Sequence, residues 1–134
     1  MLGALMITPL YAGLLALWFV VLSVRVIRIR GSEKISLGDG GNIRVTRIVR
    51  AQANFAEYVP LALLMMAILE LTHHSIYFLH ALGVTLLVAR LLHGYAFSFT
   101  QHFLFGRVAG TGLTFFVVAV EALACIRQAL AGIS

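Results

Sequence analysis

The chain has 134 residues, of which 61% are hydrophobic and only 11% are charged. Soluble domains have about half apolar and about a quarter charged residues, so this composition excludes an ordinary water-soluble protein. The length leaves room for one domain, spanning residues 1–134. The formal net charge of +5 is spread over separate connections and does not form a nucleic-acid-binding tract.

The first predicted element is a membrane-spanning helix over about Thr8–Ile29. No charged residue occurs from Met1 to Val24, and about 20 apolar residues cross the hydrocarbon core as a helix. A cleaved secretory signal carries its basic residues before the apolar run, whereas here they follow it. We therefore predict a retained anchor with its N-terminus outside the cytoplasm. The next segment, Arg30–Asn42, is rich in turn formers and predicts the longest loop.

Three further apolar segments predict spanning helices over about Ile43–Leu71, Ile76–Phe99 and Arg107–Leu130. A short polar turn, Thr72–Ser75, and a short connection, Thr100–Gly106, separate them. Connections this short make neighbouring helices antiparallel, so we predict an all-α, four-helix bundle that runs up-down-up-down. Small residues permit close helix contacts in membranes; those expected to do so are Gly83, Ala89, Gly94, Gly110 and Gly112.

The basic residues predict the orientation of this bundle. The seven that bracket the first loop are Arg25, Arg28, Arg30, Lys34, Arg44, Arg47 and Arg50. Arg90 and Arg107 bracket the third connection, and Arg127 alone lies near the opposite side of the membrane. By the positive-inside rule, the two arginine-bearing connections face the cytoplasm and both termini lie outside it.

A polar stripe runs along the predicted helix over Ile43–Leu71. At 100° per residue, five side chains fall within an arc of about 100°; they are Arg47, Arg50, Asn54, Glu57 and Tyr58. The stripe descends about 15 Å, to about the middle of the hydrocarbon core. A charge at that depth costs about 2.5–3.5 kcal/mol. Glu57 is therefore predicted to face the protein interior and to have a partner.

Two interpretations of this stripe are open. In the first, Glu57 forms an internal salt bridge with Arg50 or with Arg90 of the next helix. In the second, a pocket open to the cytoplasm receives a polar anionic ligand, with arginines for its carboxylates and Glu57 for an amine or amide. The stripe carries more arginines than carboxylates, which favours a ligand.

The run Arg50-Ala-Gln52-Ala-Asn54-Phe-Ala-Glu57-Tyr58-Val-Pro60 resembles the second-helix signature of the MAPEG family, the membrane-associated proteins in eicosanoid and glutathione metabolism. The likeness extends to the basic first loop and to Ala89-Arg90-Leu-Leu-His93-Gly94-Tyr95. The Gly-Asp-Gly-Gly loop is more similar to bacterial members that resemble microsomal glutathione transferases. The resemblance therefore implies a homotrimer in a bacterial inner membrane.

By the same resemblance, glutathione binds as co-substrate between neighbouring subunits, and the enzyme is a transferase or peroxidase for lipophilic electrophiles. Gln52 points away from the polar stripe and serves the adjacent subunit or helix packing. The glutathione-binding residues that the resemblance implies are Arg28, Arg30, Arg47, Arg50, Gln52, Asn54, Glu57, Tyr58, Arg90, His93 and Tyr95.

Arg107 is similar to the arginine that stabilises the glutathione thiolate in catalytic members of the family. A nearby guanidinium raises the thiolate fraction of a thiol whose pKa is near 8.5. Family enzymes often carry two tyrosines four residues apart at this end of the third helix. Here the register offers His93 and Phe97, or Tyr95, so one hydroxyl is missing. His102 is a substitute candidate for the role of Arg107.

A non-catalytic, trimeric membrane binder or scaffold of the same fold is the alternative function. A small multidrug exporter would carry its membrane carboxylate in the first helix, which has none. We predict no metal, because His73, His74 and His80 have no cysteine or carboxylate set at ligand spacing. Glu70 and Glu121 are predicted to lie near the outer surface.

Overall fold

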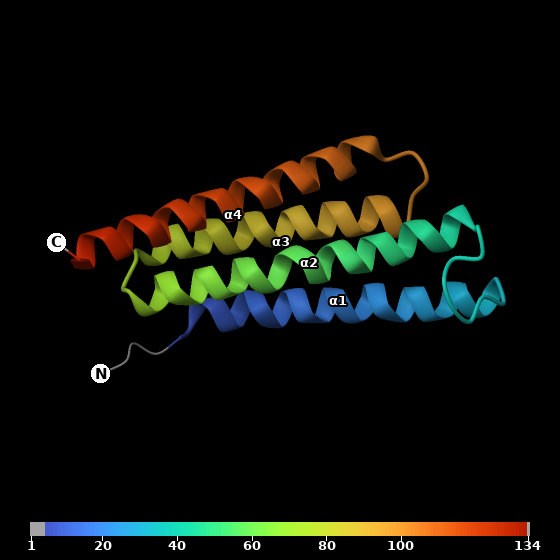
Figure 1. Ribbon diagram of the computed structural model, residues 1–134, viewed down its shortest axis with the longest axis horizontal. Helices are drawn as coiled ribbons and strands as arrows, with labels where there is room; N and C mark the ends of the chain where they lie inside the picture. Colours follow the sequence, from blue (N-terminus) through green and yellow to red (C-terminus); the bar gives the residue numbers. More distant parts are fainter. Residues whose placement is uncertain (1–4, 134) are drawn as a thin grey trace.

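Four long antiparallel helices make up the molecule. The computed structural model describes residues 5–133, and its helices are α1 (Ile7–Ser32), α2 (Ile43–Leu71), α3 (Ile76–Ser98) and α4 (Leu104–Ile133). Each is long and apolar enough to cross a membrane. Both ends of the chain lie at the same end of the bundle (Figure 1). The predicted all-α, up-down-up-down architecture is confirmed, while Met1 and its three successors lie outside the described residues.

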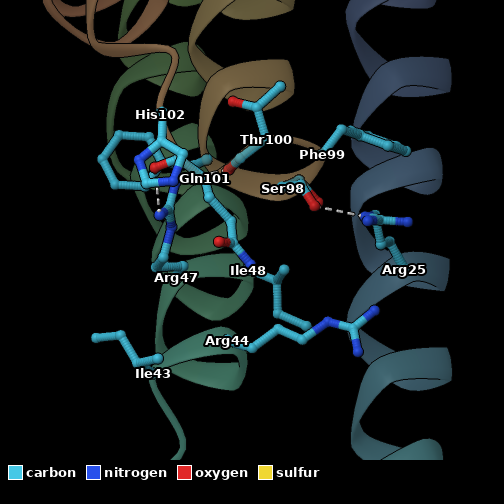
Figure 2. A pocket seen from close by; sticks show the side chains of 11 residues that line it. Arg25, Ile43, Arg44, Arg47, Ile48, Ser98, Phe99, Thr100, Gln101 and His102 are labelled. Carbon is cyan, nitrogen blue, oxygen red and sulfur yellow. Dashed lines mark hydrogen bonds between the residues drawn. The ribbon is translucent and has the colours of Figure 1, made fainter.

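The helix boundaries differ from the predicted ones by less than one turn. α1 continues past Ile29 to Ser32, and α4 begins at Leu104, so Arg107 lies within its first turn. The connection from α3 to α4 is correspondingly short. Arg47 of α2 anchors it, because its guanidinium donates to the carbonyl oxygens of Thr100 at 2.7 Å, Gln101 at 2.9 Å and Ala96 at 3.2 Å (Figure 2).

The loop between α1 and α2 is ordered by its own polar groups. Gly40 and Gly41 have φ angles of 58° and 72°, a region that glycine adopts without steric cost. Asp39 accepts hydrogen bonds from the Gly41 amide at 3.0 Å and from the Thr46 hydroxyl at 2.8 Å, and these bonds lower the pKa of Asp39. The Asn42 side chain accepts from two amides of the first turn and thereby caps α2.

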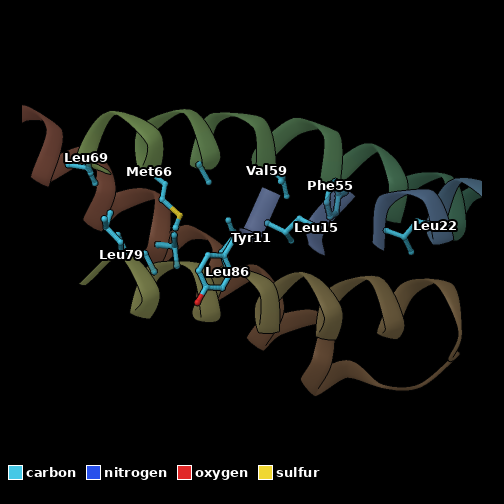
Figure 3. Close-up of a cluster of buried hydrophobic side chains, with 12 residues drawn as sticks. Tyr11, Leu15, Leu22, Phe55, Val59, Met66, Leu69, Leu79 and Leu86 are labelled. Carbon is cyan, nitrogen blue, oxygen red and sulfur yellow. The ribbon is translucent and has the colours of Figure 1, made fainter. Parts of the chain in front are cut away.

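An apolar core runs along the middle of the bundle (Figure 3). Its members come from all four helices: Tyr11, Leu15 and Leu22 of α1, Phe55, Val59, Ala62, Met66 and Leu69 of α2, Leu79, Leu82 and Leu86 of α3, and Val117 of α4. Among the described residues, α1 and α4 do not contact each other, whereas α2 and α3 contact every other helix. The bundle is therefore not closed between α1 and α4.

Glycines permit the close helix approaches that the sequence predicted, with one exception. A Cβ at Gly110 would lie 2.7 Å from the Ala89 carbonyl oxygen, so α3 and α4 touch backbone to backbone there. A Cβ at Gly83 would collide with the Tyr11 ring, and one at Gly94 would lie 2.7 Å from the Trp18 indole nitrogen. Gly112 has open space around it, so it makes no close helix contact within the single chain.

Of the two carboxylates predicted to lie near the outer surface, Glu70 lies at the end of α2 and is partly exposed, whereas Glu121 is buried. Glu70 accepts hydrogen bonds from the amides of Met6, Ile7 and Thr8, each at 2.7 Å, and so caps the N-terminus of α1. Glu121 is fully buried, and neither of its oxygens has a hydrogen-bond partner among the described residues. Its distance along α4 was predictable, but its position on the face that packs against the bundle was not.

Candidate functional site

The polar stripe of α2 divides into an inner and an outer edge. Arg47, Asn54 and Tyr58 form the inner edge, which contacts α3, α4 and their connection. Arg50 and Glu57 form the outer edge: their side chains are 58% and 51% exposed, and Arg50 Nη1 lies 3.7 Å from Glu57 Oε1. The prediction that Glu57 has a partner is confirmed. The prediction that it faces the interior is wrong for the single chain, because α3 and α4 cover only one side of the stripe.

Arg90 is the buried centre of the inner edge. It is 1% exposed; its Nη2 donates to Asn54 Oδ1 at 2.8 Å, and its Nη1 donates to the Thr114 hydroxyl at 3.4 Å. His93 Nδ1 lies 3.3 Å from Nη2 and accepts, since a guanidinium has only donors. Among the described residues Arg90 has no carboxylate partner. It therefore positions Asn54 and His93 and does not neutralise Glu57.

Arg107 lies beside this cluster in the first turn of α4, at the end of the bundle that the positive-inside rule predicts to face the cytoplasm. Its guanidinium stands 4.4 Å over the ring of Phe97, whose centroid is 4.7 Å from that of His93. Among residues 5–133, the Arg107 side chain has no carboxylate partner and donates no hydrogen bond. Of the two alignments considered for this part of α3, the structure therefore places His93 and Phe97, and not Tyr95, beside Arg107.

An open groove of about 450 Å³ extends from Arg107 along α4. Its other walls are mostly apolar: Phe97, Leu104, Val108, Thr111, Gly112 and Phe115. The Tyr58 ring lies 5.4 Å from the Phe115 ring, so the far end of the groove reaches the inner edge of the α2 stripe. Asn54, Tyr58, Arg90, His93 and Arg107 are thus brought into one connected region.

The remaining predicted residues lie elsewhere. Gln52 donates to the Ser23 hydroxyl at 2.8 Å and so links α2 to α1 within the chain. Tyr95 is half exposed and stacks on Phe99, with centroids 5.7 Å apart, on a different side of α3 from His93. Arg28 is exposed on α1 and Arg30 is partly buried.

His102 lines a second cavity, together with Arg47, and does not line the Arg107 groove. Sequence reasoning gave Thr114, Phe115 and Arg25 no site role. The spacing of four residues between Gly110 and Thr114 was the available signal that both face α3. Within the described part of the chain, no group of three or more His, Cys, Asp or Glu side chains is placed to hold a metal ion.

Comparison of the sequence with known proteins identifies a family and two relatives. The model of the MAPEG family matches residues 8–127. The inner membrane protein YecN of Escherichia coli strain K12 is 35% identical over 92 residues, which cover 69% of this chain and 70% of the relative. The YecN protein of Escherichia coli O6:H1 matches with the same identity and coverage. No solved structure matches the chain. The predicted location as an integral inner-membrane protein is confirmed by these relatives and by the four membrane-length helices.

Proposed function

We propose that this chain, which belongs to the MAPEG family, is a glutathione transferase or peroxidase that acts on lipophilic electrophiles in a bacterial inner membrane. The observation that carries the proposal is Arg107. Its guanidinium has no carboxylate partner in the described chain and stands at one end of an open, mostly apolar groove. A cation held this way is available to an anionic ligand.

The groove suits the two reactants of such an enzyme. A guanidinium keeps its proton at all physiological pH values, so Arg107 favours the thiolate of glutathione over the thiol. The thiolate is the form that attacks an electrophile. Leu104 and Val108 on the groove wall are exposed on the surface of the single chain, so an apolar substrate dissolved in the bilayer enters sideways without crossing water.

The outer edge of the α2 stripe supports binding of the tripeptide at a subunit boundary. Arg50 and Glu57 are half exposed on a spanning helix, and charges in contact with hydrocarbon are costly. A second copy of the chain, in the homotrimer typical of the family, covers this edge in our proposal. Glutathione carries two carboxylates and one ammonium group, which match Arg50 and Glu57 respectively.

A non-catalytic binder of the same fold is the second candidate, and the position of Tyr95 favours it. Tyr95 stacks on Phe99, and the ring beneath Arg107 belongs to Phe97. In this protomer a phenolic hydroxyl therefore does not assist the guanidinium. Such a protein would bind glutathione at the same residues without activating its thiol.

Activity measurements separate the two candidates. Purified protein in detergent is mixed with glutathione and a hydrophobic aryl halide, while ultraviolet absorbance reports the thiolate. We expect conjugation in the wild type and an approximately hundredfold lower kcat in Arg107→Gln, because one charge-stabilising donor is lost. Arg127→Gln, at the opposite end of α4, is the matched control. Glutathione binding with neither thiolate absorbance nor product would establish the binder.

Calorimetry tests the site itself. We expect Arg50→Ala and Glu57→Gln each to weaken glutathione binding by about tenfold or more, whereas Glu33→Gln, which alters an acid of the first loop, leaves it unchanged. Wild-type affinity in both α2 variants would defeat the site assignment. The mass of the assembly in detergent is expected to be that of three chains.

A further inference from the structure

A second, strongly basic cavity lies at the cytoplasmic end of the bundle. It has a volume of about 410 Å³ and is bounded by α1, the first turns of α2 and the connection between α3 and α4 (Figure 2). Arg25, Arg44 and Arg47 all line it, and none of the residues that line it is a carboxylate. The cavity shares only Phe97 with the groove of Arg107, and Arg50 and Glu57 do not line it.

Two of the three arginines are held in place by backbone oxygens. Arg25 donates from Nε to the Ser98 carbonyl at 2.7 Å, and its guanidinium stands 4.0 Å over the Phe99 ring. Its two terminal nitrogens donate to no other described residue. Arg47 is fixed by its three carbonyl acceptors in the same connection. These cations are therefore oriented before any ligand arrives.

Most of the positive charge of the cavity has no acidic partner among the described residues. Arg44 extends from α2 toward α1, the helix that carries Arg25 (Figure 2). Its one acidic partner is Glu33, at 3.3 Å, which stands outside the cavity. The three arginines repel one another, and the one carboxylate beside them does not cancel their charge, so the cavity has a positive potential. An anion with several oxygen acceptors would relieve that repulsion.

We propose that this cavity binds a phosphate group at the cytoplasmic membrane surface, as carried by the head of an acidic phospholipid. Guanidinium groups pair with phosphate oxygens through two parallel hydrogen bonds. Basic pockets between spanning helices on the cytoplasmic side bind phospholipid heads. Ile43, Ile48 and Phe97 supply apolar walls in the same cavity, which suit the glycerol and the first acyl carbons. A soluble phosphate compound offers the same oxygens without the apolar part.

Native mass spectrometry of the detergent-solubilised protein tests the proposal directly. We expect phosphatidylglycerol to give bound adducts at concentrations where zwitterionic phosphatidylcholine gives none, because a choline cation is repelled by the arginines. Arg25→Gln and Arg44→Gln are each expected to weaken phosphatidylglycerol binding by about tenfold. Arg127→Gln, which removes a cation from the other side of the membrane, is the control. Arg44 is exposed, so its variant tests the site even where Arg25→Gln does not fold.

The fluorescence of Trp18 can report whether the ligand binds in this cavity. It is the single tryptophan of the chain, and its ring stacks 6.2 Å from that of Phe99, on which the Arg25 guanidinium rests. Phosphatidylglycerol is therefore expected to change the Trp18 fluorescence in the wild type and to do so at about tenfold higher lipid concentration in Arg44→Gln. Inorganic phosphate is titrated in parallel.

The outcomes are distinct. Saturable, arginine-dependent binding of phosphatidylglycerol alone assigns a lipid head, and an equal response to inorganic phosphate assigns a soluble phosphate; both support a phosphate site. Adducts that do not distinguish the two lipids, or that are as abundant in Arg25→Gln and Arg44→Gln as in the wild type, overturn it. Displacement of the lipid by glutathione that is lost in Arg44→Gln would also overturn it, because the cavity would then belong to the tripeptide.

Discussion

At both ends of the bundle, a charged side chain forms hydrogen bonds with unpaired backbone groups of a helix end, and the two charges are opposite. At the outer end, the Glu70 carboxylate accepts from three amides at the start of α1. At the cytoplasmic end, the Arg47 guanidinium donates to three carbonyls at and after the end of α3. Helix starts carry unpaired N–H groups and a partial positive charge, and helix ends carry the reverse. Each charge therefore stands where the local dipole favours it.

The ends differ in what is left over. At the outer end, both oxygens of Glu70 accept from amides at the start of α1. At the cytoplasmic end Arg25, Arg44 and Arg107 retain donors after the backbone is satisfied. The Glu70 carboxylate is thus used to cap a helix, whereas the cytoplasmic arginines keep donors beyond those that the backbone uses, and both proposed sites rest on these donors.

Removing Glu70 is the largest expected disruption of this arrangement. We expect Glu70→Ala to lower the free energy of unfolding by about 3 kcal/mol, because three amides of α1 lose a charged acceptor. Thermal unfolding in detergent measures the change. Glu33→Ala, which removes an acid of the cytoplasmic loop, is the matched control. A transition as high in Glu70→Ala as in the wild type would show that water replaces the carboxylate without cost.

Replacing Glu121 should act in the opposite direction. Both of its oxygens are buried without hydrogen-bond partners in the described chain, and a buried polar group without a partner costs about 1–3 kcal/mol. We therefore expect Glu121→Leu to raise the free energy of unfolding by about 2 kcal/mol. Glu121→Gln should give a smaller change, because the amide stays polar. Destabilisation by the leucine would mean that the carboxyl has a stabilising role within the assembly.

Arg47 is expected to give the smallest of the three effects. It is only partly buried, so water replaces some of its bonds, and we expect Arg47→Gln to cost about 1–2 kcal/mol. The loss should concentrate in the connection between α3 and α4, where hydrogen exchange of the amides of residues 99–103 is expected to quicken. Arg47→Lys should restore part of the protection. Uniform exchange changes across the bundle would argue against a local anchor.

The sequence predicted the four spans because length and composition alone determine them. It also predicted which residues share the α2 stripe, since the helical repeat fixes their angles. It did not predict that Asn54 turns inward while Glu57 stays exposed, because that depends on where α3 and α4 pack. Glu121 was misplaced for the same reason: helix rise gives depth in the membrane, whereas the direction of a side chain follows from its neighbours.

Arg25 shows a different limit. Counting basic residues identifies it as an orientation signal, and that signal is the same wherever the side chain points. Its contact with the Ser98 carbonyl joins segments 73 positions apart in the chain. No local pattern encodes such a pairing, so the basic cavity emerges only from the packed bundle.

Glu70 also bears on how the protein is made. The N-terminal helix is synthesised before the second one, and its leading amides lack acceptors in the protein until the end of α2 emerges. The carboxylate then joins the start of one helix to the end of the next. We therefore expect the first two spans to pair before the second two are added.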